Sequence, residues 1–130
     1  MTGTFRCAAI ALAAVMTAAP ATAQSVTSYE AKGSFEDARA DLVDAIVNRG
    51  FVNDYKGNVG AMLDRTGADV GSTRPVYKAA EYFTFCSAKL SRAAMEADPL
   101  NMAVCPYVVF AYETAGSPGK VVVGYRRPAS

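Results

Sequence analysis

Two of the three cysteines, Cys86 and Cys105, are the residues of this sequence best suited to chemistry. Cys86 ends a predicted strand, residues 79–86, and Ser87 can cap the helix that follows it. Because the N-terminus of a helix carries partial positive charge, it lowers the pKa of a nearby thiol. The position of Cys86 therefore fits a redox-active thiol. Cu(I) could also be held by the two thiolates together with Met95 or Met102.

The same two cysteines also fit roles without chemistry of their own. No Cys-x-x-Cys spacing and no histidine accompany them, so a structural disulfide or an inert buried thiol is the simpler interpretation. Two thiols are too few for a closed zinc site, which takes four ligands. We therefore predict no metal site.

The sequence leaves a disulfide between Cys86 and Cys105 undecided. An oxidising compartment favours it, and closing a loop of about 20 residues would add roughly 3 kcal/mol to the stability. A helix over residues 87–97, however, rises about 1.5 Å per residue and carries the chain roughly 16 Å away. Bridged cysteines need Cα atoms within about 7 Å of each other. Two free thiols and an intermolecular bridge therefore stay open as alternatives.

Composition excludes several classes of function. The absence of histidine removes Ser-His-Asp and Cys-His catalysis. Lys and Arg number 13 against 12 for Asp and Glu, and a net charge of +1 provides no field for binding nucleic acid or an anionic membrane. The acidic pairs, Asp64 with Asp69 and Glu96 with Asp98, are most simply solvated surface groups. We expect no catalytic residue and no cofactor.

The first 23 residues have the pattern of a cleaved signal peptide. Arg6 precedes an apolar stretch, residues 7–16, and Ala21-Thr22-Ala23 is a small-x-small cleavage site. The stretch is shorter than the about 20 residues that a bilayer span requires. We therefore expect a soluble periplasmic domain that carries no net charge once Arg6 is removed, without attachment to the membrane.

Residues 25–127 are expected to form one α+β domain. Ser34 and Asp37 predict the start of a helix that Gly50 ends, a short helix covers residues 58–66, and a third covers residues 87–97. Strands are predicted at residues 26–32, 51–55, 79–86, 104–113 and 120–126, the last two as a hairpin. Each of the two main helices has one apolar stripe, so both are expected on one face of a mixed, mostly antiparallel sheet of about five strands. The expected fold is a two-layer sandwich of split βαβ type, ferredoxin-like or TBP-like.

The opposite face of that sheet would carry tyrosines with no helix over them. Tyr82, Thr84 and Cys86 alternate with the apolar residues of their strand and so point to this face. Tyr107 and Tyr125 from the last two strands would complete a flat, amphipathic patch suited to a small ligand or a second subunit. Ordinary strand packing is the alternative.

Two stretches of the chain resemble a known family. Residues 85–99 read Phe-Cys-Ser-Ala-Lys-Leu-Ser-Arg-Ala-Ala-Met-Glu-Ala-Asp-Pro, and residues 103–113 read Ala-Val-Cys-Pro-Tyr-Val-Val-Phe-Ala-Tyr-Glu. Together with the earlier Ser-Phe-Glu-Asp-Ala-Arg and Arg-Gly-Phe-Val segments, they resemble domain-of-unknown-function family 302 (DUF302) over residues 29–127. The resemblance implies a small α+β domain of prokaryotes, frequently oligomeric and without an established catalytic activity.

The match is incomplete at the cysteines. Cys86 and Pro106 match the family pattern, whereas Ser87-Ala88 stand where the family has Asn-Pro. Tyr107 stands where the family has its second cysteine, and Cys105 comes before the proline instead. Because a shift of one residue turns a side chain to the other face of a sheet, a role shared by the family's cysteines need not hold here.

We therefore expect an exported, non-catalytic accessory domain that binds a small ligand or a protein partner through its tyrosine-bearing face and the turn at Cys86. The alternative is a periplasmic thiol redox or Cu(I)-handling protein that uses Cys86 and Cys105. A self-associating domain, a homo-oligomer without a ligand, is the third option.

Overall fold

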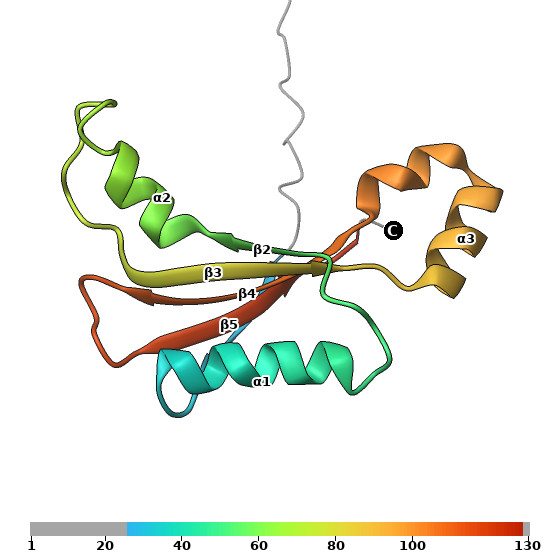
Figure 1. Cartoon of the computed structure of the whole chain (residues 1–130), viewed down its shortest axis with the longest axis horizontal. Helices are drawn as coiled ribbons and strands as arrows, with labels where there is room; N and C mark the ends of the chain where they lie inside the picture. The colour runs from blue at the N-terminus through green and yellow to red at the C-terminus, as the bar shows by residue number, and fades with distance from the viewer. Residues whose placement is uncertain (1–25, 129–130) are drawn as a thin grey trace, which may run out of the picture.

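The computed structural model describes residues 26–128, and the predicted signal peptide, residues 1–23, lies outside them. None of the described helices has the length and apolar character needed to cross a membrane. Figure 1 shows the elements in chain order: β1 (Val26–Ala31), α1 (Phe35–Val47), β2 (Tyr55–Asn58), α2 (Val59–Thr66), β3 (Tyr77–Phe85), α3 (Ala88–Ala97), the 3-10 helix η1 (Pro99–Val104), β4 (Tyr107–Thr114) and β5 (Val121–Arg126).

The strands form one five-stranded sheet in the order β1-β5-β4-β3-β2. Each neighbouring pair is antiparallel, including the predicted hairpin of β4 and β5. The α+β class and the strand number are thus confirmed. The sheet is antiparallel throughout the described residues, where the sequence suggested a mixed one.

Helix α1 packs on one face of the sheet and forms the core there. It begins with the predicted capping box, in which the Ser34 hydroxyl accepts a hydrogen bond from the N–H of Asp37 at 3.1 Å. Phe35 and Ala38 then pack against Ala111 of β4 and Val121 of β5. We call this side of the sheet the α1-covered face.

Strand β2 begins later than predicted, at Tyr55 instead of Phe51. The N–H of Phe51 donates to the carbonyl of Ile46 at 3.2 Å, so Phe51 belongs to the turn that ends α1. Its ring stacks on Phe85 with centroids 5.3 Å apart. Helix α2 follows β2 directly and packs against β3, so β2 and α2 together border that strand.

Helix α3 lies beyond the end of the sheet and packs mainly against η1 (Figure 1). None of its residues is buried, and Leu90 is 57% exposed. The expectation that both main helices cover one face therefore holds for α1 and is wrong for α3. The apolar stripe of α3 is mostly alanine, and such small side chains gain little by burial against a sheet.

The strand register assigns each side chain of the sheet to one of two faces. Glu81 pairs with Ala111 on the α1-covered face, while Ala80 pairs with Tyr112 and Tyr82 pairs with Phe110 on the opposite one. No described helix packs across this second side, and its aromatic side chains are half-buried except for the exposed Tyr55. We call it the open face.

Candidate functional site

Two aromatic rings of the open face lie over glycines of neighbouring strands. A Cβ added to Gly57 of β2 would meet Cε1 of Tyr82 at 2.1 Å, and one added to Gly124 of β5 would meet Cζ of Phe110 at 2.5 Å. Both rings therefore occupy the space that a side chain at the glycine would fill. The absence of a side chain at each glycine lets the ring lie close to the sheet.

The open face carries further aromatic contacts around Phe110 and Tyr82. Phe110 and Tyr112 are stacked with ring centroids 6.1 Å apart. Tyr77 meets Tyr112 edge to face at 5.6 Å, which is possible because a register shift between Tyr77 and Ala79 turns Tyr77 to this side. Tyr55 lies 6.1 Å from Tyr82. The rings thus extend across β2, β3 and β4.

A pocket of about 290 Å³ opens among these rings. Ala80 is buried at 5% exposure, and its methyl group is small beside the aromatic side chains that surround it. The hollow is thus a consequence of one small residue among large ones. Its walls come mainly from Tyr77, Tyr82, Phe110 and Tyr112, with Val59 of α2 beside them. We call it the tyrosine pocket.

Of the three tyrosines predicted to share a face, only Tyr82 lies in this pocket. Tyr107 pairs with Phe85 and Tyr125 pairs with Val109, which places both on the α1-covered face. The expectation of a shared face is wrong for these two, because their side chains alternate with those of the pocket. Tyr107 packs on Phe85 with centroids 5.7 Å apart, and Tyr125 is 38% exposed.

The sequence did not single out Tyr77, Phe110 and Tyr112 as site residues. A period-two count along β4 would have placed Phe110 and Tyr112 together and separated them from Tyr107. It would not have shown which face of β4 continues that of Tyr82, because this requires the pairing register.

Cys86 and Cys105 are joined by a disulfide, with Cα atoms 6.2 Å apart. The helix was expected to carry the chain away from Cys86, but η1 folds back along α3 and returns Cys105 to it. Both sulfurs are in the bond, so thiol or Cu(I) chemistry would first need its reduction. Among residues 26–128, no three Cys, Asp or Glu side chains are grouped to hold a metal ion.

The disulfide and the tyrosine pocket are separate places. Cys86 lies six positions along the chain from Ala80, and at about 3.3 Å per residue of strand this is roughly 20 Å. The predicted combination of the open face with the turn at Cys86 is thus not a single site.

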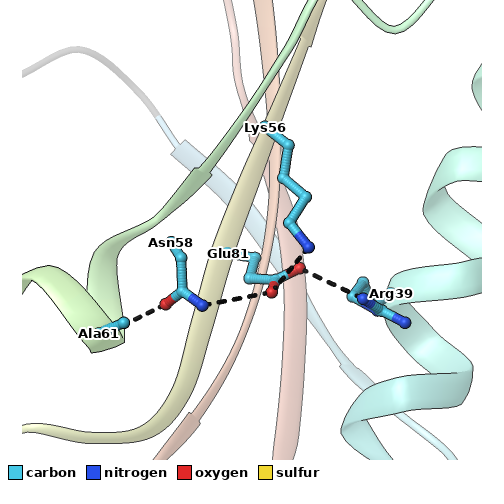
Figure 2. A network of polar contacts seen from close by, with 5 residues as sticks. All are labelled: Arg39, Lys56, Asn58, Ala61 and Glu81. Carbon is cyan, nitrogen blue, oxygen red and sulfur yellow. Dashed lines mark hydrogen bonds and ion pairs between the residues drawn. The ribbon is translucent and has the colours of Figure 1, made fainter.

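On the α1-covered face, a buried carboxylate links the sheet to α1 and to the start of α2 (Figure 2). Glu81 is 8% exposed, and its Oε1 lies 3.1 Å from Nζ of Lys56 and accepts a hydrogen bond from Nδ2 of Asn58 at 3.5 Å. Oε2 lies 3.9 Å from Nη1 of Arg39 on α1. Asn58 also caps α2 by accepting from the N–H of Ala61 at 2.9 Å. The network therefore fixes α1, β2, β3 and the start of α2 relative to one another.

A second buried carboxylate, Glu113, holds the β4–β5 turn. Its Oε1 accepts hydrogen bonds from the N–H of Gly119 and from Nζ of Lys78, the latter at 2.9 Å. The Gly119 hydrogen bond, followed by that of Lys78, lowers the pKa of Glu113 below its usual range. Because both donors stabilise the ionised form, Glu113 is a structural anion in this fold.

Comparison with known proteins supports the fold and the family. The chain matches a family described as "Domain of unknown function DUF302" over residues 26–130. No curated protein matches the sequence. The crystal structure of an uncharacterized conserved DUF302 protein from Bacillus stearothermophilus is similar, with a TM-score of 0.65 and 13% identity over 82% of this chain and 76% of that chain. With the family match spanning most of its length and the fold shared with that relative, the chain belongs to the DUF302 family.

Proposed function

We propose that this chain is an exported, non-catalytic accessory domain that binds a small, flat, aromatic ligand in the tyrosine pocket. The observation that carries the proposal is the pocket of about 290 Å³ walled by four aromatic side chains on a face that no described helix covers. Aromatic walls with a few polar atoms are typical of small-molecule sites.

The size of the pocket limits the ligand. Its volume is near the lower bound of the roughly 300–1,000 Å³ that such sites usually span. One or two fused rings fit this space, and they can stack on or meet the edges of Phe110 and Tyr112 as these rings already meet each other. The hydroxyl groups of Tyr77, Tyr82 and Tyr112 add hydrogen-bonding capacity at the walls.

A binding experiment tests the proposal directly. The mature domain is titrated by calorimetry with 2-naphthamide, a neutral two-ring probe. We expect saturable one-to-one binding, weakened at least fivefold both by Tyr112→Ala, which removes a wall, and by Val59→Phe, which fills the space. Tyr29→Ala is the matched control, because Tyr29 lies on edge strand β1 and is 60% exposed.

Two outcomes would contradict the proposal. Absence of binding by the folded wild-type domain is one. The other is a dimer in sedimentation that Tyr112→Ala dissociates and Tyr29→Ala does not, because the open face would then be an interface between two copies of the chain. Export is tested separately, by recovering the protein from the periplasm of an expressing bacterium and determining whether its mass corresponds to cleavage after Ala23.

A further inference from the structure

We propose that the ligand carries a carboxylate and that Arg65 binds it, in a hollow that adjoins the tyrosine pocket. This inference rests on the proposed function, since it names the class of ligand for the same site: an aromatic carboxylic acid. The supporting observation is a second hollow in the open face, on the side of Tyr82 away from the tyrosine pocket.

A second hollow of about 360 Å³ lies between Tyr55, Tyr82 and helix α2. It shares Tyr82 and Val59 with the tyrosine pocket, so the two hollows meet at these residues. A short substituent on a ring in the tyrosine pocket would therefore have to extend over Tyr82 or Val59 to reach the second hollow.

The side of α2 that borders this hollow is set by helical spacing. Val59, Met62 and Arg65 recur every three residues along α2, so they follow one side of the helix. All three line the second hollow. The sequence thus places an apolar residue nearest the tyrosine pocket and a cation at the far end.

Arg65 is the one charged side chain among the described residues that line the second hollow. It makes no ion pair within residues 26–128, whereas Arg39 and Arg92 are each paired with a glutamate. No carboxylate lines this hollow to compete for the guanidinium. The one acid at the tyrosine pocket, Glu81, has its carboxylate held by Lys56 and Asn58 on the α1-covered face.

The chemistry of the two ends defines the ligand class. A guanidinium binds a carboxylate through two parallel N–H···O hydrogen bonds. The aromatic walls accept a flat ring by stacking or edge contacts. A ring acid with the carboxylate on or close to the ring satisfies both ends at once, whereas an aliphatic diacid would leave the aromatic walls unused.

A pair of isosteric probes tests the inference. Calorimetry compares 2-naphthoate with 2-naphthamide, which have the same shape and differ in charge. We expect the wild-type domain to bind 2-naphthoate about tenfold more tightly, as expected for a charged hydrogen-bonded pair that is partly exposed. Arg65→Gln should abolish this preference and leave the affinity for 2-naphthamide unchanged. Arg92→Gln, which removes the same charge from α3, is the control.

Each remaining outcome has a definite meaning. Equal binding of the two probes to the wild type overturns this inference and leaves the proposed function intact. A preference for 2-naphthoate that persists in Arg65→Gln, or that Arg92→Gln also abolishes, overturns the role of Arg65. Binding of neither probe overturns the proposed function together with the inference.

Discussion

Alanine substitutions at the two ring-covered glycines should have unequal effects. In Gly57→Ala the new Cβ would lie 2.1 Å from Cε1 of Tyr82, but that ring is half-buried and can turn outward. Overpacking of this kind lowers the free energy of unfolding by about 1–3 kcal/mol. Replacing a glycine within a strand by alanine raises it by about 0.5–1 kcal/mol. We expect Gly57→Ala to lower the free energy of unfolding by about 1 kcal/mol.

Gly124→Ala should cost more. Its Cβ would meet Cζ of Phe110 and the backbone oxygen of Thr27, both at 2.5 Å. A ring can turn away, but the Thr27 carbonyl can move only if β1 separates from β5. We therefore expect Gly124→Ala to lower the free energy of unfolding by about 3 kcal/mol, near the upper end of the range for overpacking.

Urea unfolding measures both losses, and Gly116→Ala is the control because nothing lies within 4 Å of its added Cβ. Gly116→Ala should be neutral or stabilising by up to about 1 kcal/mol. Gly57→Ala should also weaken 2-naphthamide binding, because the displaced Tyr82 is a wall of the pocket. Equal stabilities for all three variants would falsify the placement of the rings over the glycines.

Three further predictions concern the carboxylates and the disulfide. Lys56→Met should lower the free energy of unfolding, measured with urea, by about 2 kcal/mol, which is less than the roughly 3–5 kcal/mol lost when a fully buried pair is broken. The loss is smaller because the Lys56 side chain is 44% exposed and Arg39 stays beside Glu81. An unchanged free energy of unfolding would contradict the ion-pair network. Since the pKa of Glu113 is lowered in the folded state, its stabilising effect is complete above the ordinary carboxyl pKa and is lost as the pH falls through the lowered one. The melting temperature of the wild type should therefore fall more steeply below about pH 4.3 than that of Glu113→Gln, and parallel curves would count against this role. Replacing Cys86 and Cys105 by alanine should abolish hydrogen-exchange protection in α3 and η1 while β3 and β4 stay protected, since α3 buries no residue; loss of protection in the sheet would refute this independence.

Most of the elements could be predicted from the sequence because their signals are local. Ser34 and Asp37 are three residues apart and make the capping box that was expected. The β4–β5 hairpin follows from a glycine-containing turn between two apolar runs. Side-chain alternation within β3 also placed Tyr82 and Phe83 on different faces of the sheet, as the register shows.

The composition of the site could not be predicted, because it depends on pairing between distant strands. Tyr82 and Phe110 are 28 positions apart, and only the β3–β4 register brings them to one face. The partners of Glu81 are equally remote, since Arg39 and Lys56 come from two other elements. The disulfide stayed undecided for a similar reason, because it depends on the return of the chain through η1.

The register around the disulfide has a consequence for how the molecule can vary. Phe85 and Tyr107 pair across β3 and β4, so these strands are the two arms of one β-hairpin whose connection, residues 86–106, forms a helical insertion. Hairpin connections of two to five residues are common, so a short turn could replace this insertion without changing either strand. Removal of the insertion should therefore leave the walls of the tyrosine pocket in place, because the wall residue nearest to it, Tyr82, lies four positions, roughly 13 Å, from Cys86 along β3.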